Sequence, residues 1–142
     1  MNERQYIYYA DDDEDDAEFF SDAAAELGHG LELFSNGKLL VETLCNSVVK
    51  PDIIFIDLHM PQSTGSKILQ EIRDCTDFKL IPVILITGYS KNSTEIKRYL
   101  DAGANYLLEK PTSHQEYINS LSKILNMDWK TYKASSDDFL SA

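Results

Sequence analysis

Short apolar runs alternate along the chain with stretches in which apolar residues recur every three or four positions. The short runs predict buried strands, because apolar runs of this length are too short for a typical helix. They fall at residues 6–10, 31–34, 53–57, 81–86 and 105–108. The periodic stretches predict amphipathic helices. These helices are expected at residues 13–27, 37–45, 65–74, 92–102 and 113–125.

This regular alternation predicts an α/β domain with a parallel sheet, right-handed crossovers and helices on both faces. A chain of 142 residues with 43% hydrophobic composition is long enough for one domain with a substantial core. The apolar pattern fades after residue 126. We therefore expect a single domain over residues 1–126 and a short C-terminal extension over 127–142, with no output domain.

Composition excludes several classes of function. The net charge of −11, from 24 acids and 13 bases, is opposite to what a nucleic-acid-binding surface requires. No run approaches the roughly 20 apolar residues of a membrane span, and the N-terminus has no apolar signal-peptide core. Cys45 and Cys75 lie in helical patterns and not in CxxC spacing, so neither a metal site nor a redox pair is predicted. A reduced, cytoplasmic setting is expected.

Polar residues follow the predicted strands at four places. Asp11 and Asp12 follow the first strand, Asp57 ends the third, Thr87 follows the fourth and Lys110 follows the fifth. The carboxyl ends of parallel strands share one edge of the sheet, which is where open α/β sheets bind ligands. These side chains are therefore candidates for a common site.

Three carboxylates at one edge require a cation, because two charges about 4 Å apart repel by about 4 kcal/mol at an effective dielectric near 20. Oxygen ligands without His or Cys favour Mg²⁺ or Mn²⁺. With Lys110 as a second positive charge and Thr87 as a hydroxyl donor, Asp57 is placed to act as a nucleophile toward a phosphoryl group. The simpler alternatives are a turn cap for Asp57 and solvated, helix-capping acids for residues 11–16.

Four motifs carry a resemblance to a known family. They are Asp11-Asp12-Asp13 after the first strand, Asp57-Leu58-His59-Met60-Pro61 with Gly65 beyond it, Thr87-Gly88, and Glu109-Lys110-Pro111. Over roughly residues 5–126 the chain resembles the receiver domain of two-component response regulators, of the chemotaxis-regulator type. The resemblance implies a flavodoxin-like (βα)5 fold with a doubly wound parallel sheet in the strand order 2-1-3-4-5.

The resemblance also implies roles for single residues. Asp57 would be the phosphoacceptor, and Asp12 would bind Mg²⁺ directly while Asp11 binds it mostly through water. His59 would contribute its backbone carbonyl to the metal. Thr87 and Lys110 would bind the phosphoryl group.

The same resemblance implies a cis peptide between Lys110 and Pro111. It further implies a phosphohistidine donor on a sensor histidine kinase or a histidine phosphotransfer protein.

The chain departs from the family pattern at two places. Receivers usually have Tyr or Phe three residues before the lysine, as an aromatic that moves with the threonine, but this position is Leu107. The neighbouring Tyr106 is expected to point to the opposite face, because strand side chains alternate. His59 and Tyr89, two residues after Asp57 and Thr87, are expected to flank the phosphoryl group and to slow attacking water.

We expect a stand-alone signalling protein that is not an enzyme apart from its own phosphorylation and dephosphorylation. Its downstream protein partner would bind the surface from the fourth to the fifth helix, and the chain would be a monomer or a weak homodimer. One alternative is a binding module that has kept the fold without the chemistry. Another is a Mg²⁺-dependent phosphatase with an aspartyl nucleophile, which needs a second acid at the position of His59.

Overall fold

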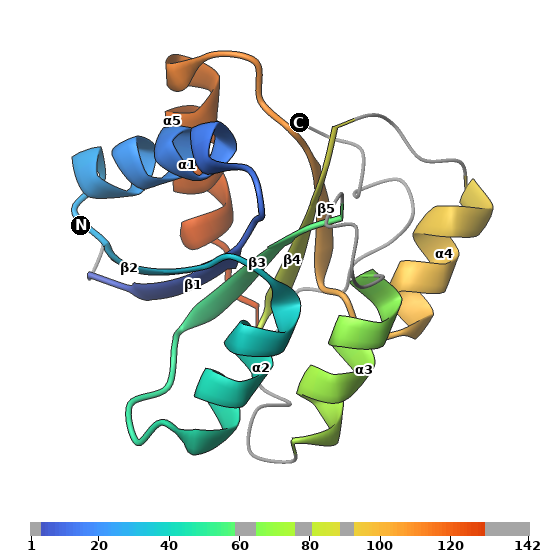
Figure 1. Cartoon of the computed structure of the whole chain (residues 1–142). Coiled ribbons are helices and arrows are strands. Elements are labelled where there is room, and N and C mark those ends of the chain that lie inside the picture. The colour runs from blue at the N-terminus through green and yellow to red at the C-terminus, as the bar shows by residue number, and fades with distance from the viewer. Residues whose placement is uncertain (1–3, 59–64, 76–80, 89–92, 130–142) are drawn as a thin grey trace.

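The fold is a five-stranded parallel sheet between two layers of helices (Figure 1). The computed structural model describes residues 4–58, 65–75, 81–88 and 93–129. In chain order the elements are β1 (Tyr6–Ala10), α1 (Glu14–Glu26), β2 (Gly30–Phe34), α2 (Gly37–Asn46), β3 (Ile53–Asp57), α3 (Gly65–Asp74), β4 (Val83–Thr87), α4 (Ser93–Asp101), β5 (Tyr106–Glu109) and α5 (His114–Leu125). In this part of the chain no helix is both long and apolar enough to cross a membrane.

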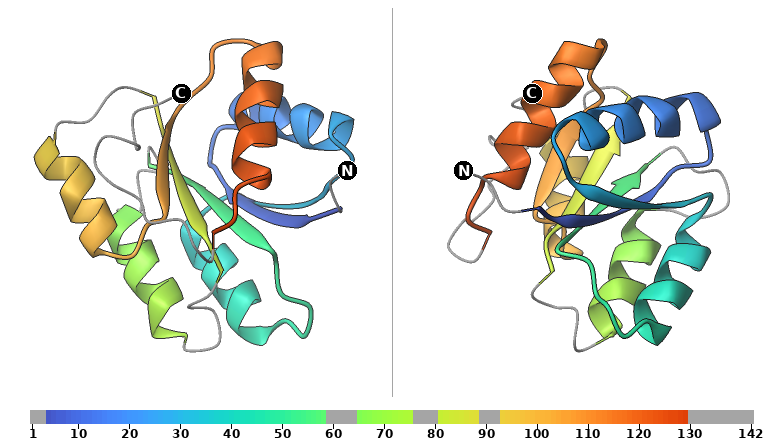
Figure 2. Two further views of the ribbon diagram at one scale, coloured as in Figure 1. Left: turned by 180° about the vertical axis from the view of Figure 1, so that it is seen from behind. Right: turned by 90° about the vertical axis from the view of Figure 1, so that its left-hand side faces the viewer.

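The strand order is β2-β1-β3-β4-β5, and every neighbouring pair is parallel. This confirms the predicted flavodoxin-like arrangement. Helices α1 and α5 cover one face of the sheet, and α2, α3 and α4 cover the other (Figure 2). Strands β3 and β4 are buried along their whole length, which explains why their sequences are apolar without alternation.

The two faces of the sheet have different cores. Aromatic rings fill the face covered by α1 and α5, where Tyr9 stacks on Phe20 with ring centroids 4.1 Å apart and Phe20 meets Phe55 edge-on. The opposite face is mostly aliphatic and includes Ile54 and Leu85. Each of these side chains, when fully buried, stabilises the fold by about 1.5–3 kcal/mol, so both layers fix the sheet on which the polar strand ends are held.

Side chains of β5 alternate between these two cores as predicted. Tyr106 lies in the core on the α5 side, where its ring meets Trp129 edge-on at a centroid distance of 6.0 Å. Leu107 lies in the opposite core, together with Ile96 of α4. The tyrosine therefore does not occupy the α4 side of β5.

Side-chain caps begin the helices that frame the strand ends. The Asp13 carboxylate accepts hydrogen bonds from the backbone N–H groups of Asp15 and Asp16, and Ser113 accepts one from Glu116 N–H. Asp and Ser are both residue types that favour this capping position. Asn92, which precedes α4, lies outside the described residues.

The prediction that the two cysteines form no redox pair was wrong. Cys45 at the end of α2 and Cys75 just after α3 form a disulfide, with their Cα atoms 6.7 Å apart. The packing of α2 against α3 brings these helix ends together, although 30 positions separate the cysteines in the sequence. A separation of that size gives no signal that a spacing rule could detect.

Candidate functional site

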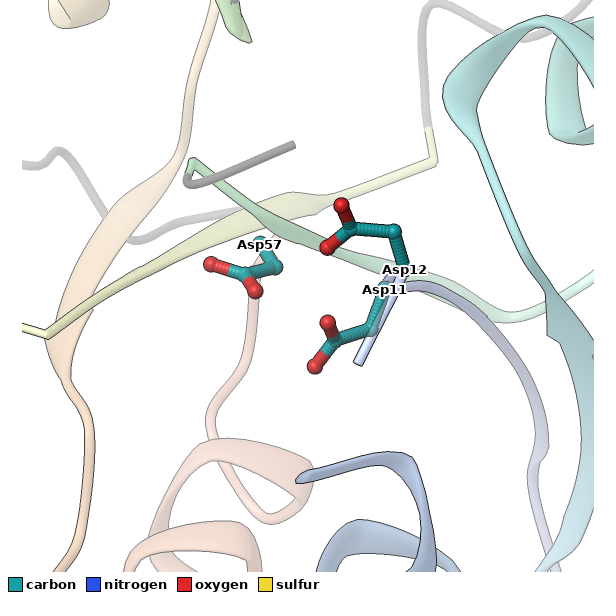
Figure 3. Close-up of side chains that lie close together, drawn as sticks. All are labelled: Asp11, Asp12 and Asp57. Carbon is teal, nitrogen blue, oxygen red and sulfur yellow. The ribbon is translucent and has the colours of Figure 1, made fainter. Parts of the chain in front are cut away.

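Three carboxylates meet at the carboxyl edge of the sheet. Asp11 and Asp12 directly follow β1, and Asp57 is the last residue of β3, the strand that pairs with β1. One carboxylate oxygen from each lies within 4.8 Å of the others. Figure 3 shows the carboxyl groups of Asp11 and Asp12 turned toward the side on which Asp57 lies. The structure thus brings together the three acids that the sequence singled out.

Two of the three acids are buried. Asp11 is 5% exposed and Asp57 is 2% exposed, whereas Asp12 is exposed. The Asp11 carboxylate accepts hydrogen bonds from the Tyr9 hydroxyl and the Asp13 backbone N–H. Burial outweighs these two hydrogen bonds, which lower the pKa of Asp11, and raises it to about 6, with a smaller contribution from the neighbouring Asp57. The charged form of Asp11 is therefore costly in this pocket.

Lys110 supplies one positive charge from the end of β5. Its Nζ atom lies 3.7 Å from Asp57 Oδ2 but only 2.6 Å from Asp16 Oδ2. Burial alone would lower the pKa of Lys110, but the hydrogen bond to Asp16 and the charge of Asp57 outweigh it and raise the pKa. Lys110 is therefore charged at neutral pH and shared between two carboxylates.

The sequence analysis missed Asp16, which it grouped with the solvated acids at the start of the first helix. The available signal was its helical spacing from Phe20, the next core residue of α1, four positions on. A residue at that spacing lies on the helix face that packs against the sheet. Asp16 is therefore turned toward the pocket, and not toward solvent with Asp15.

Thr87 ends β4 and is completely buried. Its carbonyl accepts a 2.6 Å hydrogen bond from the Lys110 backbone N–H, which holds the last residue of β4 beside the start of the β5–α5 connection.

Contrary to the expectation, the Lys110–Pro111 peptide is trans, as are the other peptide bonds of the described residues. Trans is the lower-energy isomer even before proline. His59 and Tyr89 lie outside the described residues.

The donor set fits a hard divalent cation. Carboxylate oxygens are the ligands that Mg²⁺ and Mn²⁺ prefer, and Mg²⁺ usually keeps several waters beside one or two carboxylates. Exposure of Asp12 leaves one side open to water, and a bound cation would favour the charged form of Asp11, which burial disfavours. Asp11, Asp12 and Asp57 are the residues that would hold such an ion.

The fold and this pocket define a class: flavodoxin-like α/β domains with an acidic pocket at the carboxyl ends of the two central strands. Residues 7–122 match the model of the response regulator receiver domain. The chain therefore belongs to the response regulator receiver family. Receiver domains are typically signalling modules of two-component systems, where they pair with histidine kinases, and are not enzymes in their own right.

Individual proteins show the same likeness. The chain is 26% identical over 127 residues to the 3',5'-cyclic-nucleotide phosphodiesterase regA of Dictyostelium discoideum, covering 89% of this chain but 16% of that protein. Among solved structures, the chemotaxis response regulator CheY4 of Vibrio cholerae superposes with a TM-score of 0.76 at 19% identity, covering 86% of this chain and 99% of that one. The Mn²⁺-bound form of response regulator Rcp1 has a TM-score of 0.73 at 23% identity, covering 87% and 96%.

Proposed function

We propose that Asp57 accepts a phosphoryl group from a phosphohistidine, on a sensor histidine kinase or a histidine phosphotransfer protein, and that the phosphorylated domain signals through a change of conformation. The observation that carries this proposal is the meeting of three carboxylates within 4.8 Å, with the Lys110 ammonium 3.7 Å from Asp57. A turn cap requires neither the two neighbouring acids nor the lysine.

In the transfer step an Asp57 oxygen attacks phosphorus while the bond from phosphorus to the imidazole nitrogen breaks. The imidazole leaves with the electron pair, and the product is an aspartyl phosphate. A divalent ion held by Asp11, Asp12 and Asp57 would neutralise charge on the transferring oxygens. Lys110 neutralises further charge on these oxygens, because its Nζ atom already lies beside Asp57.

Thr87 is the residue best placed to sense the new group. It is buried at the end of β4, one position beyond the partner of Asp57 in the sheet register, and its carbonyl is tied to the Lys110 backbone. We propose that its hydroxyl binds a phosphoryl oxygen. The resulting shift biases α4 and its neighbours, so that a downstream protein binds the surface from α4 to α5.

The test is intact-mass spectrometry after incubation with Mg²⁺ and phosphoramidate, a small phosphodonor. Wild type should gain one phosphoryl group, Asp57→Asn should gain none, and chelation of Mg²⁺ should abolish the gain. Asp22→Asn is the matched control, because Asp22 is exposed on α1 away from the pocket. Equal labelling of wild type and Asp57→Asn would refute the proposal.

A second candidate is a binding module that works without phosphorylation. Leu107 favours it, because the α4 side of β5 lacks the aromatic residue that usually accompanies threonine movement in the family. The same mass measurement separates the two candidates, since a module of this kind takes up no phosphoryl group with any donor.

A further inference from the structure

Lys110 is closer to an acid of α1 than to the proposed phosphoacceptor. Its Nζ atom lies 2.6 Å from Asp16 Oδ2 and 3.7 Å from Asp57 Oδ2. The lysine side chain is 19% exposed and that of Asp16 is 29% exposed, so solvent screens the pair only in part. A charge-assisted hydrogen bond of this length is among the stronger polar contacts in proteins.

We propose that Asp16 is a positioning residue that retains Lys110 in the unphosphorylated protein, and that phosphorylation transfers Lys110 from Asp16 to the phosphoryl group. This inference rests on the proposed function of Asp57. It adds a resting-state partner for the lysine, so the lysine must exchange one contact for another during activation.

The exchange follows from charge and geometry. The Lys110 ammonium has three N–H donors, and in the resting pocket it lies 2.6 Å from the Asp16 carboxylate and 3.7 Å from that of Asp57. An aspartyl phosphate carries more negative charge than the Asp57 carboxylate and presents three further acceptor oxygens, and the Lys110 ammonium already lies 3.7 Å from the oxygen of Asp57. The transition state for transfer needs that same ammonium, so the contact with Asp16 must weaken before or during the step.

Removing the Asp16 charge should therefore speed phosphorylation. Ion pairs that are partly screened by solvent change an equilibrium by a factor of up to about five. We expect Asp16→Asn to take up phosphoryl groups from phosphoramidate about three to five times faster than wild type at equal Mg²⁺. Asp15→Asn is the matched control, because Asp15 directly precedes Asp16 in the first turn of α1 and is exposed. It makes the same change in net charge and should leave the rate unchanged.

A double-mutant cycle tests whether Asp16 acts through Lys110. In a Lys110→Gln background, Asp16→Asn should give no gain in rate, because no ammonium remains to be released. Restoring the acid as Asp16→Glu in the wild-type background should return the rate toward that of wild type. A merely structural effect of Asp16→Asn would persist in the Lys110→Gln background.

A direct readout is the ¹³C shift of the Asp16 carboxyl carbon in NMR spectra. Addition of beryllofluoride, a phosphoryl analogue, should move it in the sense expected for loss of the ammonium partner. The inference is overturned if Asp16→Asn is no faster than wild type, if the gain survives in Lys110→Gln, or if the Asp16 signal does not respond. Failure of the proposed function has a different signature, since wild type would then take up no phosphoryl group at all and both proposals would fall.

Discussion

Asp11 should destabilise the domain when no divalent cation is bound. Burial raises the pKa of its carboxyl from 3.8 to about 6, so the folded state binds a proton more tightly than the unfolded chain does. Between those two values folding takes up a proton, and stability falls as the pH rises through this window. A shift of about two pKa units is worth about 3 kcal/mol above pH 7. Asp11→Asn removes this cost but weakens the hydrogen bond from Asp13 N–H, so we expect a net gain of about 2 kcal/mol.

The assay is urea unfolding followed by circular dichroism, with a chelator present, at several pH values from 5 to 8. The variant should be more stable than wild type at pH 8, and the difference should shrink toward pH 5. Mg²⁺ at ten times its dissociation constant should stabilise wild type by about 1.4 kcal/mol and the variant by less. If Asp11→Asn were no more stable than wild type at pH 8 without cations, the electrostatic account of the pocket would be wrong.

Two further predictions concern the structural framework of the same domain. Arg73→Met should lower the free energy of unfolding by about 2–4 kcal/mol, because the guanidinium donates hydrogen bonds to the Ile81 and Gly103 carbonyls. The measurement is urea unfolding, in which Arg73→Lys should recover only part of the lost free energy of unfolding. Reducing the Cys45–Cys75 disulfide, which spans 30 positions, should lower stability by about 3 kcal/mol. A Cys45→Ser variant whose urea midpoint still responded to dithiothreitol would contradict the second prediction.

The sheet and the acidic pocket could be predicted from the sequence because both follow from local patterns and one topological rule. Buried runs such as 53–56 and 83–86 are apolar throughout, so their assignment as central parallel strands needed no long-range information. Once the strands are parallel, the acids that follow them must lie at one edge. The parallel arrangement of the strands is therefore enough to predict that Asp11, Asp12 and Asp57 lie close together.

The contact between Asp16 and Lys110 depends on more than topology. It requires the placement of α1 over the sheet and the conformation of a long lysine side chain, and 94 positions separate the two residues. The disulfide between Cys45 and Cys75 likewise depends on how α2 packs against α3. Spacing rules describe neighbours within one element, so they detect neither contact.

The proposed cation site, Lys110 and the proposed phosphoacceptor Asp57 depend on one another through their charges. Among the described residues, the pocket gathers the carboxylates of Asp11, Asp12 and Asp57, and the ammonium of Lys110 lies between Asp57 and a fourth acid, Asp16. Phosphorylation adds further negative charge to the most deeply buried of the four acids. A divalent cation held by Asp11, Asp12 and Asp57 would offset the charge of the acids at the strand ends. Among the described residues, Lys110 is the base that lies beside Asp57, and to meet the new charge it must loosen its contact with Asp16.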